Sequence, residues 1–152
     1  DNVDPSTGKE AEFKNVHFLG KMPQNQVADW LSRASVFALP AKYEPFGLAG
    51  LEAAMSGCAL VLGDIPSQHE IWNDAACFVN PTKPEELQAT LQKLISDEFH
   101  RNIMSCRAIR NSWAYRAKRF GYDYLKAYTK LLMQRELKLS ELSELSESEF
   151  SE

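Results

Sequence analysis

Short apolar runs alternate with amphipathic stretches along most of this chain of 152 residues. Uninterrupted apolar runs are typical of parallel strands that are buried on both faces. We therefore predict strands at 36–39, 59–62 and 76–79, and we also predict a short strand at 16–19, with the sequence V-H-F-L. The other stretches have helical spacing, and we predict helices at 24–34, 47–56, 69–73, 85–96 and from 98 to about 138, with a break near Ser112. This alternation predicts an α/β fold, in which helices flank a Rossmann-like parallel sheet.

Particular residues mark the ends of these predicted helices. Gly57 follows the helix at 47–56, where a C-terminal glycine is common. Ser67 is the expected N-cap of the helix at 69–73. Pro84 opens the helix at 85–96, because proline suits the first helical position.

The two ends of the chain differ in composition from the rest. Residues 1–14 are polar, with Pro5 and Gly8 as turn formers, and we expect a leader or a truncated edge there. Residues 139–152 repeat Leu, Ser and Glu with a period of three, which drifts around a helix of 3.6 residues per turn. Such a segment does not keep one apolar stripe, so we expect a disordered tail or a fraying helix.

The composition narrows the classes of function. Apolar residues make up 44% and charged residues 25% of the chain, as in ordinary soluble globular proteins. A net charge of −4 argues against a general nucleic-acid binder, which usually carries a basic face. The sequence has no apolar run long enough to span a bilayer, which leaves peripheral membrane contact open.

Three cysteines, Cys58, Cys77 and Cys106, have spacings that fit no metal site. Cys58 and Cys77 lie in apolar runs, and we interpret both as small core residues. Unpaired cysteines of this kind fit a reducing compartment, so we expect a cytoplasmic location.

The segment 44–52, with the sequence E-P-F-G-L-A-G-L-E, holds the main candidate for a site. It follows a predicted strand and opens a predicted helix, and in open α/β sheets ligands bind at this end of the strands. Pro45 suits a helix start, and Gly47 lets backbone approach a bulky group closely. The free amides of Phe46, Gly47 and Leu48 at the positive end of the helix dipole predict an anion site.

Two carboxylates, Glu44 and Glu52, lie on either side of this predicted anion site. The helical rise puts them roughly 10 Å apart. This arrangement suits a nucleotide sugar, which has a ribose, a diphosphate and a hexose in that order. The alternative is a loop carboxylate and a solvated helix residue with no function. Glycoside hydrolysis is disfavoured, because its two carboxylates flank one bond, and a dehydrogenase is disfavoured because no G-x-G-x-x-G motif follows a strand.

The motif and its surroundings resemble the C-terminal nucleotide-binding domain of retaining glycosyltransferases of group 1, also called family 4, which have the GT-B fold. The pattern E-x-F-G-L-x-x-x-E of that family is complete at 44–52. Four flanking segments also match, and together they extend the resemblance over residues 15–128: V-H-F-L-G at 16–20, A-S-V-F-A-L-P at 34–40, G-C-A-L-V-L-G-D at 57–64 and S-Q-H-E-I at 67–71.

The resemblance implies that residues 15–138 are a donor-binding domain, and it implies a role for each motif residue. Glu44 would bond hydroxyls of the transferred hexose and is the expected catalytic residue. The amides of Phe46 to Leu48 would face the diphosphate, and Glu52 would bind the ribose. Met22, in the turn at 20–22, would lie near the base. The family implies a nucleotide-diphosphate sugar as substrate, retaining transfer, no cofactor and no metal, and the sequence has no D-x-D pair.

The family also uses parts that we do not find in this sequence. An N-terminal domain supplies the acceptor site, and an Arg/Lys pair neutralises the leaving diphosphate; residues 1–39 contain no matching pair. Stabilisation of developing charge is usually the largest catalytic term, so we expect the chain alone to be nearly inactive. We interpret it as a fragment, a truncated gene product or one piece of a split enzyme. The alternatives are a non-catalytic remnant that binds nucleotide or a partner and, more weakly, an epimerase or phosphorylase of the same fold.

Five further polar residues have structural interpretations. We expect Glu70 to bond a nearby backbone group, and a role in donor binding is the alternative. Asp64 is expected in a turn, although it follows a strand and could face the cleft. His17, His69 and His100 lack partners at metal-ligand spacing.

Two groups of residues have two interpretations each: Lys42 and Tyr43 at the rim of the motif, and the aromatic residues of the last helical region. Lys42 and Tyr43 either narrow the choice of sugar or pack at the rim. In relatives a final helix of this kind crosses toward the other domain; the alternative is an ordinary packing stripe. The aromatic residues of this last helical region are Trp113, Tyr115, Phe120, Tyr122, Tyr124 and Tyr128.

Overall fold

A computed structural model describes residues 14–149, with side chains to residue 139. Most of the predicted leader at 1–14 therefore lies outside the described residues. The elements in chain order are α1 (Gln24–Arg33), β1 (Val36–Leu39), α2 (Leu48–Met55), β2 (Ala59–Gly63), α3 (Pro66–Trp72), η1 (Asn73–Ala75), β3 (Cys77–Val79), α4 (Pro84–Ser96), α5 (Glu98–Ser112), η2 (Trp113–Tyr115) and α6 (Ala117–Glu149).

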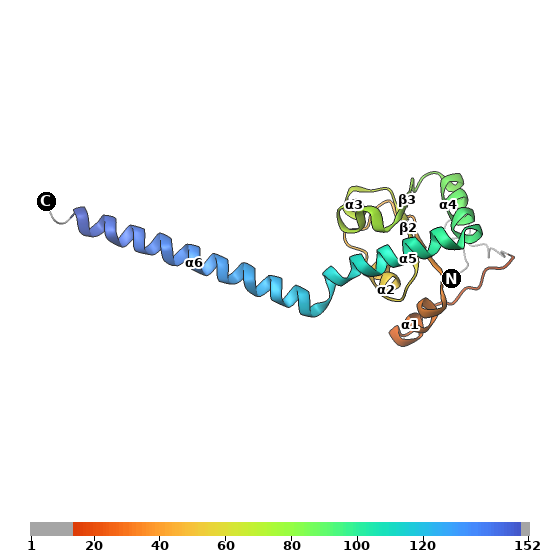
Figure 1. The fold of residues 1–152 in the computed structure, drawn as a ribbon, viewed down its shortest axis with the longest axis horizontal. Helices are drawn as coiled ribbons and strands as arrows, with labels where there is room; N and C mark the ends of the chain where they lie inside the picture. The colour runs from red at the N-terminus through yellow and green to blue at the C-terminus, as the bar shows by residue number, and fades with distance from the viewer. Residues whose placement is uncertain (1–13, 150–152) are drawn as a thin grey trace.

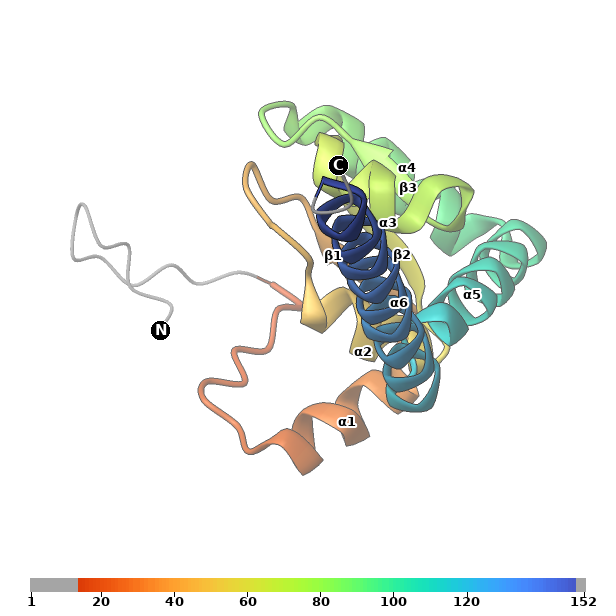
Figure 2. The same ribbon diagram turned by 90° about the vertical axis from the view of Figure 1, so that its left-hand side faces the viewer.

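The sheet has three parallel strands in the order β1-β2-β3, with helices on both faces (Figures 1 and 2). The predicted α/β class with a parallel sheet is confirmed. The strand predicted at 16–19 is wrong, because these residues have no strand conformation and are exposed. A strand needs a neighbour for its hydrogen bonds, and within the described residues nothing pairs with the outer edge of β1.

The strand β2 is the centre of the hydrophobic core. All five of its residues are buried, and the first four alternate between two clusters. Leu60 and Leu62 pack with residues of α2, α3 and α5, whereas Ala59 and Val61 pack with Leu94 of α4 and with α5. A parallel strand covered on both faces needs such a continuous apolar run, which is why the sequence pattern identified it.

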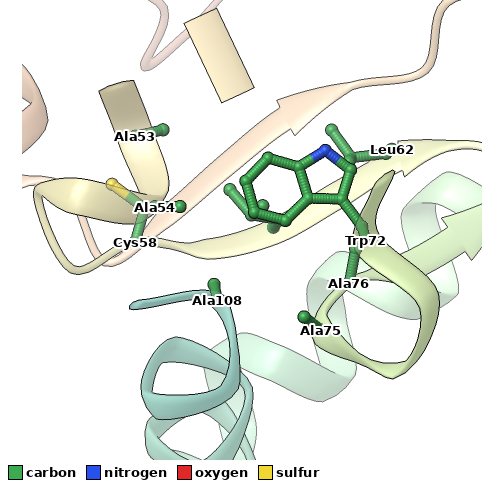
Figure 3. Packing of buried hydrophobic residues seen from close by; sticks show 9 residues of the cluster. Ala53, Ala54, Cys58, Leu62, Trp72, Ala75, Ala76 and Ala108 are labelled. Carbon is green, nitrogen blue, oxygen red and sulfur yellow. The ribbon is translucent and has the colours of Figure 1, made fainter. Parts of the chain in front are cut away.

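Small residues let α2 pack closely on the sheet. Ala53 and Ala54 are fully buried, and a Cβ on Gly50 would lie 3.8 Å from the Trp72 ring. Figure 3 shows the Trp72 indole in the middle of this cluster, with Leu62 beside it and alanines of α2 and α5 around it. This packing places Trp72 of α3 against Gly50 of α2.

The long helix α6 extends away from the α/β body (Figure 1). The break predicted near Ser112 is confirmed, since α5 ends there and η2 precedes α6. The helix continues to Glu149, where we expected a disordered or fraying tail; Leu and Glu favour helix locally. Ten large apolar side chains of α6 are each more than half exposed: Phe120, Tyr122, Tyr124, Leu125, Tyr128, Leu131, Leu132, Met133, Leu137 and Leu139. An ordinary packing stripe is therefore wrong for this helix.

Within the described residues, no helix combines the length and the apolar character that crossing a bilayer requires.

Candidate functional site

The loop between β1 and α2 lies against the carboxyl end of β2. The amide of Ala41 donates to the Leu39 carbonyl over 2.8 Å, which closes a tight turn directly after β1. A Cβ on Gly63 would collide with the Ala41 carbonyl oxygen. Glycine at the end of β2 therefore allows the candidate loop to pass close to the sheet.

Gly47 sets the start of α2. It is the N-cap residue, in the left-handed conformation with φ 82° and ψ 62°, and α2 begins at Leu48. The helix predicted at 47–56 is confirmed to within one residue, and the left-handed turn at Gly47 separates Pro45 from the first helical residue. A Cβ on Gly47 would lie 3.3 Å from Glu44 Cγ and 3.4 Å from Gln68 Nε2. Both the conformation and the space therefore favour glycine.

The amides at the start of α2 are open. The first helical hydrogen bond runs from Leu51 N–H to the Gly47 carbonyl over 3.1 Å. Within the part of the chain that the structure describes, no group accepts a hydrogen bond from the amides of Phe46, Gly47 and Leu48. The ring of Phe46 contacts Tyr115 edge-on, with 5.4 Å between ring centroids. That these amides bind a diphosphate remains a prediction.

Glu44 is half-buried and is held through its backbone. Its carbonyl oxygen accepts from Ser67 Oγ at 2.6 Å and from Gln68 Nε2 at 3.3 Å. Ser67 is thus not an N-cap: α3 begins at Pro66, whose ring favours the first helical position. Gln68, only 3% exposed, was missed by the sequence reasoning. Its position four residues before Trp72, on the buried face of α3, was the available indication.

Glu52 lies on the other side of α2, beside α1. Its Oε1 accepts from Gln24 Nε2 at 3.4 Å. The two residues help to line a hollow of about 180 Å³ between α1 and α2, together with Ala28, Leu31, Met55 and Ser56. Met22 is half-buried and precedes α1 by two residues. The structure thus brings Glu52 to the start of α1, close in sequence to Met22, whereas Glu44 contacts α3.

Asp64 and His69 form a pair that the sequence reasoning did not find. Asp64 Oδ1 lies 2.6 Å from His69 Nε2, and the Asp64 amide donates to the Val79 carbonyl. The His69 ring packs on Phe78, with 3.8 Å between ring centroids. Asp64 therefore has the expected turn role, and its spacing of five residues from His69 was the only local indication of the pair.

The remaining polar candidates make few contacts. Glu70 is exposed, and its carboxylate has no hydrogen bond within the described residues, so the expected structural bond is wrong. The Tyr43 side chain is 83% exposed, which rules out packing at the rim. His17 is exposed, and His100 contacts Asp97 only through its backbone amide.

The three cysteines are free and differ in their exposure. Cys58 is fully buried and Cys77 is half-buried, and burial raises the pKa of both thiols. Cys58 Sγ donates weakly to the carbonyls of Leu31 and Ala34, each at 3.4 Å. Cys106 is exposed. Among the described residues, no group of three His, Cys, Asp or Glu side chains is arranged to hold a metal ion.

Comparisons with known proteins agree on one family. Residues 9–118 match the family model described as "Glycosyl transferases group 1". O-antigen chain mannosyltransferase B of Escherichia coli is 27% identical over 108 residues, which cover 71% of this chain and 27% of that protein. A glycogen synthase of Mycobacterium tuberculosis is 39% identical over 57 residues, which cover 38% of this chain and 14% of that protein.

Solved structures show the same architecture. Sucrose-phosphate synthase from Thermosynechococcus elongatus superposes with a TM-score of 0.69 at 20% identity, covering 78% of this chain and 30% of that one. The chain therefore spans about a quarter to a third of the lengths of the mannosyltransferase and the sucrose-phosphate synthase. The likeness confirms the predicted GT-B type of fold. Because the family model matches more than half of its length, this chain belongs to the glycosyl transferases group 1 family.

Proposed function

We propose that this chain is the donor-binding part of a retaining glycosyltransferase that moves a hexose from a nucleotide-diphosphate sugar to an acceptor without a metal ion. One observation carries the proposal: the amides of Phe46, Gly47 and Leu48 have no acceptor in the described part of the chain. They lie at the positive end of α2, where phosphate groups bind readily. A diphosphate would supply the acceptors that these amides lack.

The two carboxylates fit the two ends of such a donor. Glu44 lies on the α3 side of the loop and Glu52 on the α1 side of α2. Carboxylates accept hydrogen bonds from hydroxyls, so Glu44 would bind the hexose and Glu52 the ribose. Met22, just before α1, would then lie near the base. A contact between Glu44 and the hexose that strengthens as the glycosidic bond breaks would also accelerate transfer.

Turnover requires more than these residues. The chain spans 27% of the E. coli mannosyltransferase, and the acceptor site and the charges that stabilise the leaving diphosphate would come from another domain or a split partner chain. The exposed apolar side chains of α6 favour contact with such a partner, because large exposed patches of this kind mark interaction surfaces. The chain alone should therefore bind the donor and transfer sugar at a negligible rate.

A non-catalytic remnant that binds nucleotide or a partner protein is the second candidate. Residues 1–39 contain no matching Arg/Lys pair, so nucleotide binding is the activity that both candidates share. An N-terminal acceptor domain, encoded in the same gene or in an adjacent reading frame, would favour the transferase, whereas a gene without either would favour the remnant.

Calorimetric titration with UDP, GDP, ADP and their hexose conjugates, mannose included, tests the proposal. We expect one nucleotide to bind, and Glu52→Ala to weaken it by about 1–3 kcal/mol for the loss of hydrogen bonds to a charged group. Glu70→Ala is the matched control, since Glu70 is an exposed helical carboxylate without a hydrogen bond in the described residues. A folded wild-type chain that binds no nucleotide, or an unchanged affinity in Glu52→Ala, would contradict the donor-site assignment.

A further inference from the structure

We propose that Ser67 and Gln68, at the start of α3, are positioning residues that hold the Glu44 loop in the conformation that binds the sugar part of the donor. The inference rests on the proposed function of Glu44. Its basis is a pair of hydrogen bonds that converge on one backbone atom, the Glu44 carbonyl oxygen.

These two bonds are the only ones that fix the middle of the loop. Between the turn at Ala41 and the first turn of α2, no other backbone atom of residues 42–46 is hydrogen-bonded within the described residues. A carbonyl oxygen has two lone pairs, and here Ser67 and Gln68 occupy both. The orientation of the Glu44 peptide plane, and with it the direction of the Glu44 side chain, therefore depends on α3.

Gln68 contacts both ends of the turn. Its Nε2 donates to the Glu44 carbonyl and lies 3.4 Å from the position that a Cβ on Gly47 would take. The side chain is 3% exposed, and burying an amide is costly unless it is hydrogen-bonded. The contact to Glu44 satisfies this need, so the loop and the buried amide stabilise each other.

The helix α3 is a rigid support for these contacts. Trp72, on the same buried face as Gln68, is 1% exposed and lies in the main core cluster. Ser67 and Gln68 therefore transmit the position of the core to the loop. Glu52 has different supports, since it lies within α2 and contacts Gln24 of α1. If the loop loses its bonds to α3, the proposed contact between Glu44 and the hexose should therefore weaken more than the one between Glu52 and the ribose.

The chain offers a matched pair of variants for the test. Ser67→Ala removes a hydroxyl that donates to a backbone carbonyl over 2.6 Å. Ser105→Ala removes a hydroxyl that makes the same kind of bond, also 2.6 Å long, to the Gly57 carbonyl, before the start of β2. Gln68→Leu removes the second bond at similar side-chain size, and Ser67→Thr keeps the hydroxyl and should restore wild-type behaviour.

Two measurements are made on each variant, after circular dichroism has shown that it is folded. Calorimetry compares a nucleoside diphosphate with its hexose conjugate. For Ser67→Ala and Gln68→Leu we expect the conjugate to bind about fivefold more weakly, the effect of one net hydrogen bond, while the nucleoside diphosphate binds within twofold of wild type. Nuclear magnetic relaxation of the Phe46, Gly47 and Leu48 amides should show lower order parameters than in the wild type.

The outcomes separate this inference from the function on which it rests. Equal weakening of both ligands, or unchanged order parameters in both loop variants, would overturn the positioning role, and so would equal effects in Ser105→Ala. If the wild-type chain binds none of the ligands, the proposed function fails and the assignment to the sugar fails with it. In that case the order parameters still decide whether Ser67 and Gln68 hold the loop.

Discussion

The α/β body and the helix α6 use apolar residues in opposite ways. Every residue of β2 is buried between two layers of helices, whereas ten large apolar side chains of α6 are more than half exposed. Figure 2, which looks nearly along α6, shows that helix in front of the sheet and its covering helices. Apolar content alone therefore does not indicate where the core lies. The candidate site belongs to the body, so its geometry depends on packing that α6 does not share.

The sharpest test of this contrast compares one leucine from each region. Leu60→Ala in β2, where the side chain is fully buried, should lower the free energy of unfolding by roughly 2–5 kcal/mol. Leu132→Ala in α6, where the side chain is 56% exposed, should change it by less than about 0.5 kcal/mol. Urea unfolding followed by circular dichroism measures both, and similar losses in the two variants would show that α6 packs on something in solution.

Binding offers a second comparison. Glu44→Ala in the body should spare the free nucleotide and weaken the nucleotide sugar by about 1–3 kcal/mol, because only the sugar loses its partner. Glu136→Ala removes an exposed carboxylate from α6 and should change neither affinity. Titration calorimetry with a matched pair of ligands checks this. Equal losses for nucleotide and nucleotide sugar in Glu44→Ala would argue against the sugar contact.

Two glycines give opposite expectations for the same substitution. Gly47→Ala places a Cβ on a left-handed residue close to Glu44 and Gln68, and should destabilise the body by about 1–2 kcal/mol. Gly121→Ala lies within α6 with open space around it, and should stabilise that helix by roughly 0.5–1 kcal/mol. Urea unfolding reports the loss in Gly47→Ala, and thermal scans of helicity report the gain in Gly121→Ala. A stabilised Gly47→Ala variant would contradict the left-handed turn.

The parts of the fold that sequence predicted are those where local pattern and tertiary burial coincide. The strands at 36–39 and 59–62 were found to within one residue, because burial on both faces leaves a continuous apolar run. The strand predicted at 16–19, where His17 interrupts the apolar residues, failed, since a strand depends on a neighbour that no local pattern reveals. The C-terminal tail, for which we expected disorder or a fraying helix, is helical to Glu149, because its Leu and Glu residues favour helix even where no apolar stripe persists.

The candidate site also contains residues that the sequence predicted and residues that it did not. The motif at 44–52 and the open amides of Phe46 to Leu48 could be predicted, because a strand, a turn and a helix follow one another in the sequence. Ser67 and Gln68 could not be assigned to the loop, because they contact Glu44 across more than 20 residues of chain. Their role depends on how α3 packs beside α2, which is a property of the core and not of any local pattern.

The smallest expected effect concerns two paired carboxylates, one in each region. Glu86, in the first turn of α4, accepts from the Asn80 amide and from Lys83 Nζ, each at 3.0 Å. The bond from the Asn80 amide, and then the one from Lys83, lower the pKa of Glu86 below its ordinary value. Asp123, in α6, pairs with Arg119 of the same helix at 2.8 Å.

A lowered pKa determines the direction of the pH effect. The carboxylate form of Glu86 stabilises the fold above the unfolded pKa of about 4.3, and this contribution is lost as the pH falls through the lower folded pKa. Glu86→Gln should therefore be less stable than wild type at pH 7, and the difference should shrink between pH 5 and pH 3. Asp123→Asn should not change the unfolding of the body at either pH, because its pair lies within α6. Urea unfolding at pH 7, 5 and 3 measures both differences; a difference for Glu86→Gln that grows on acidification would contradict the assigned bonds, because only the ionised carboxylate accepts from both partners.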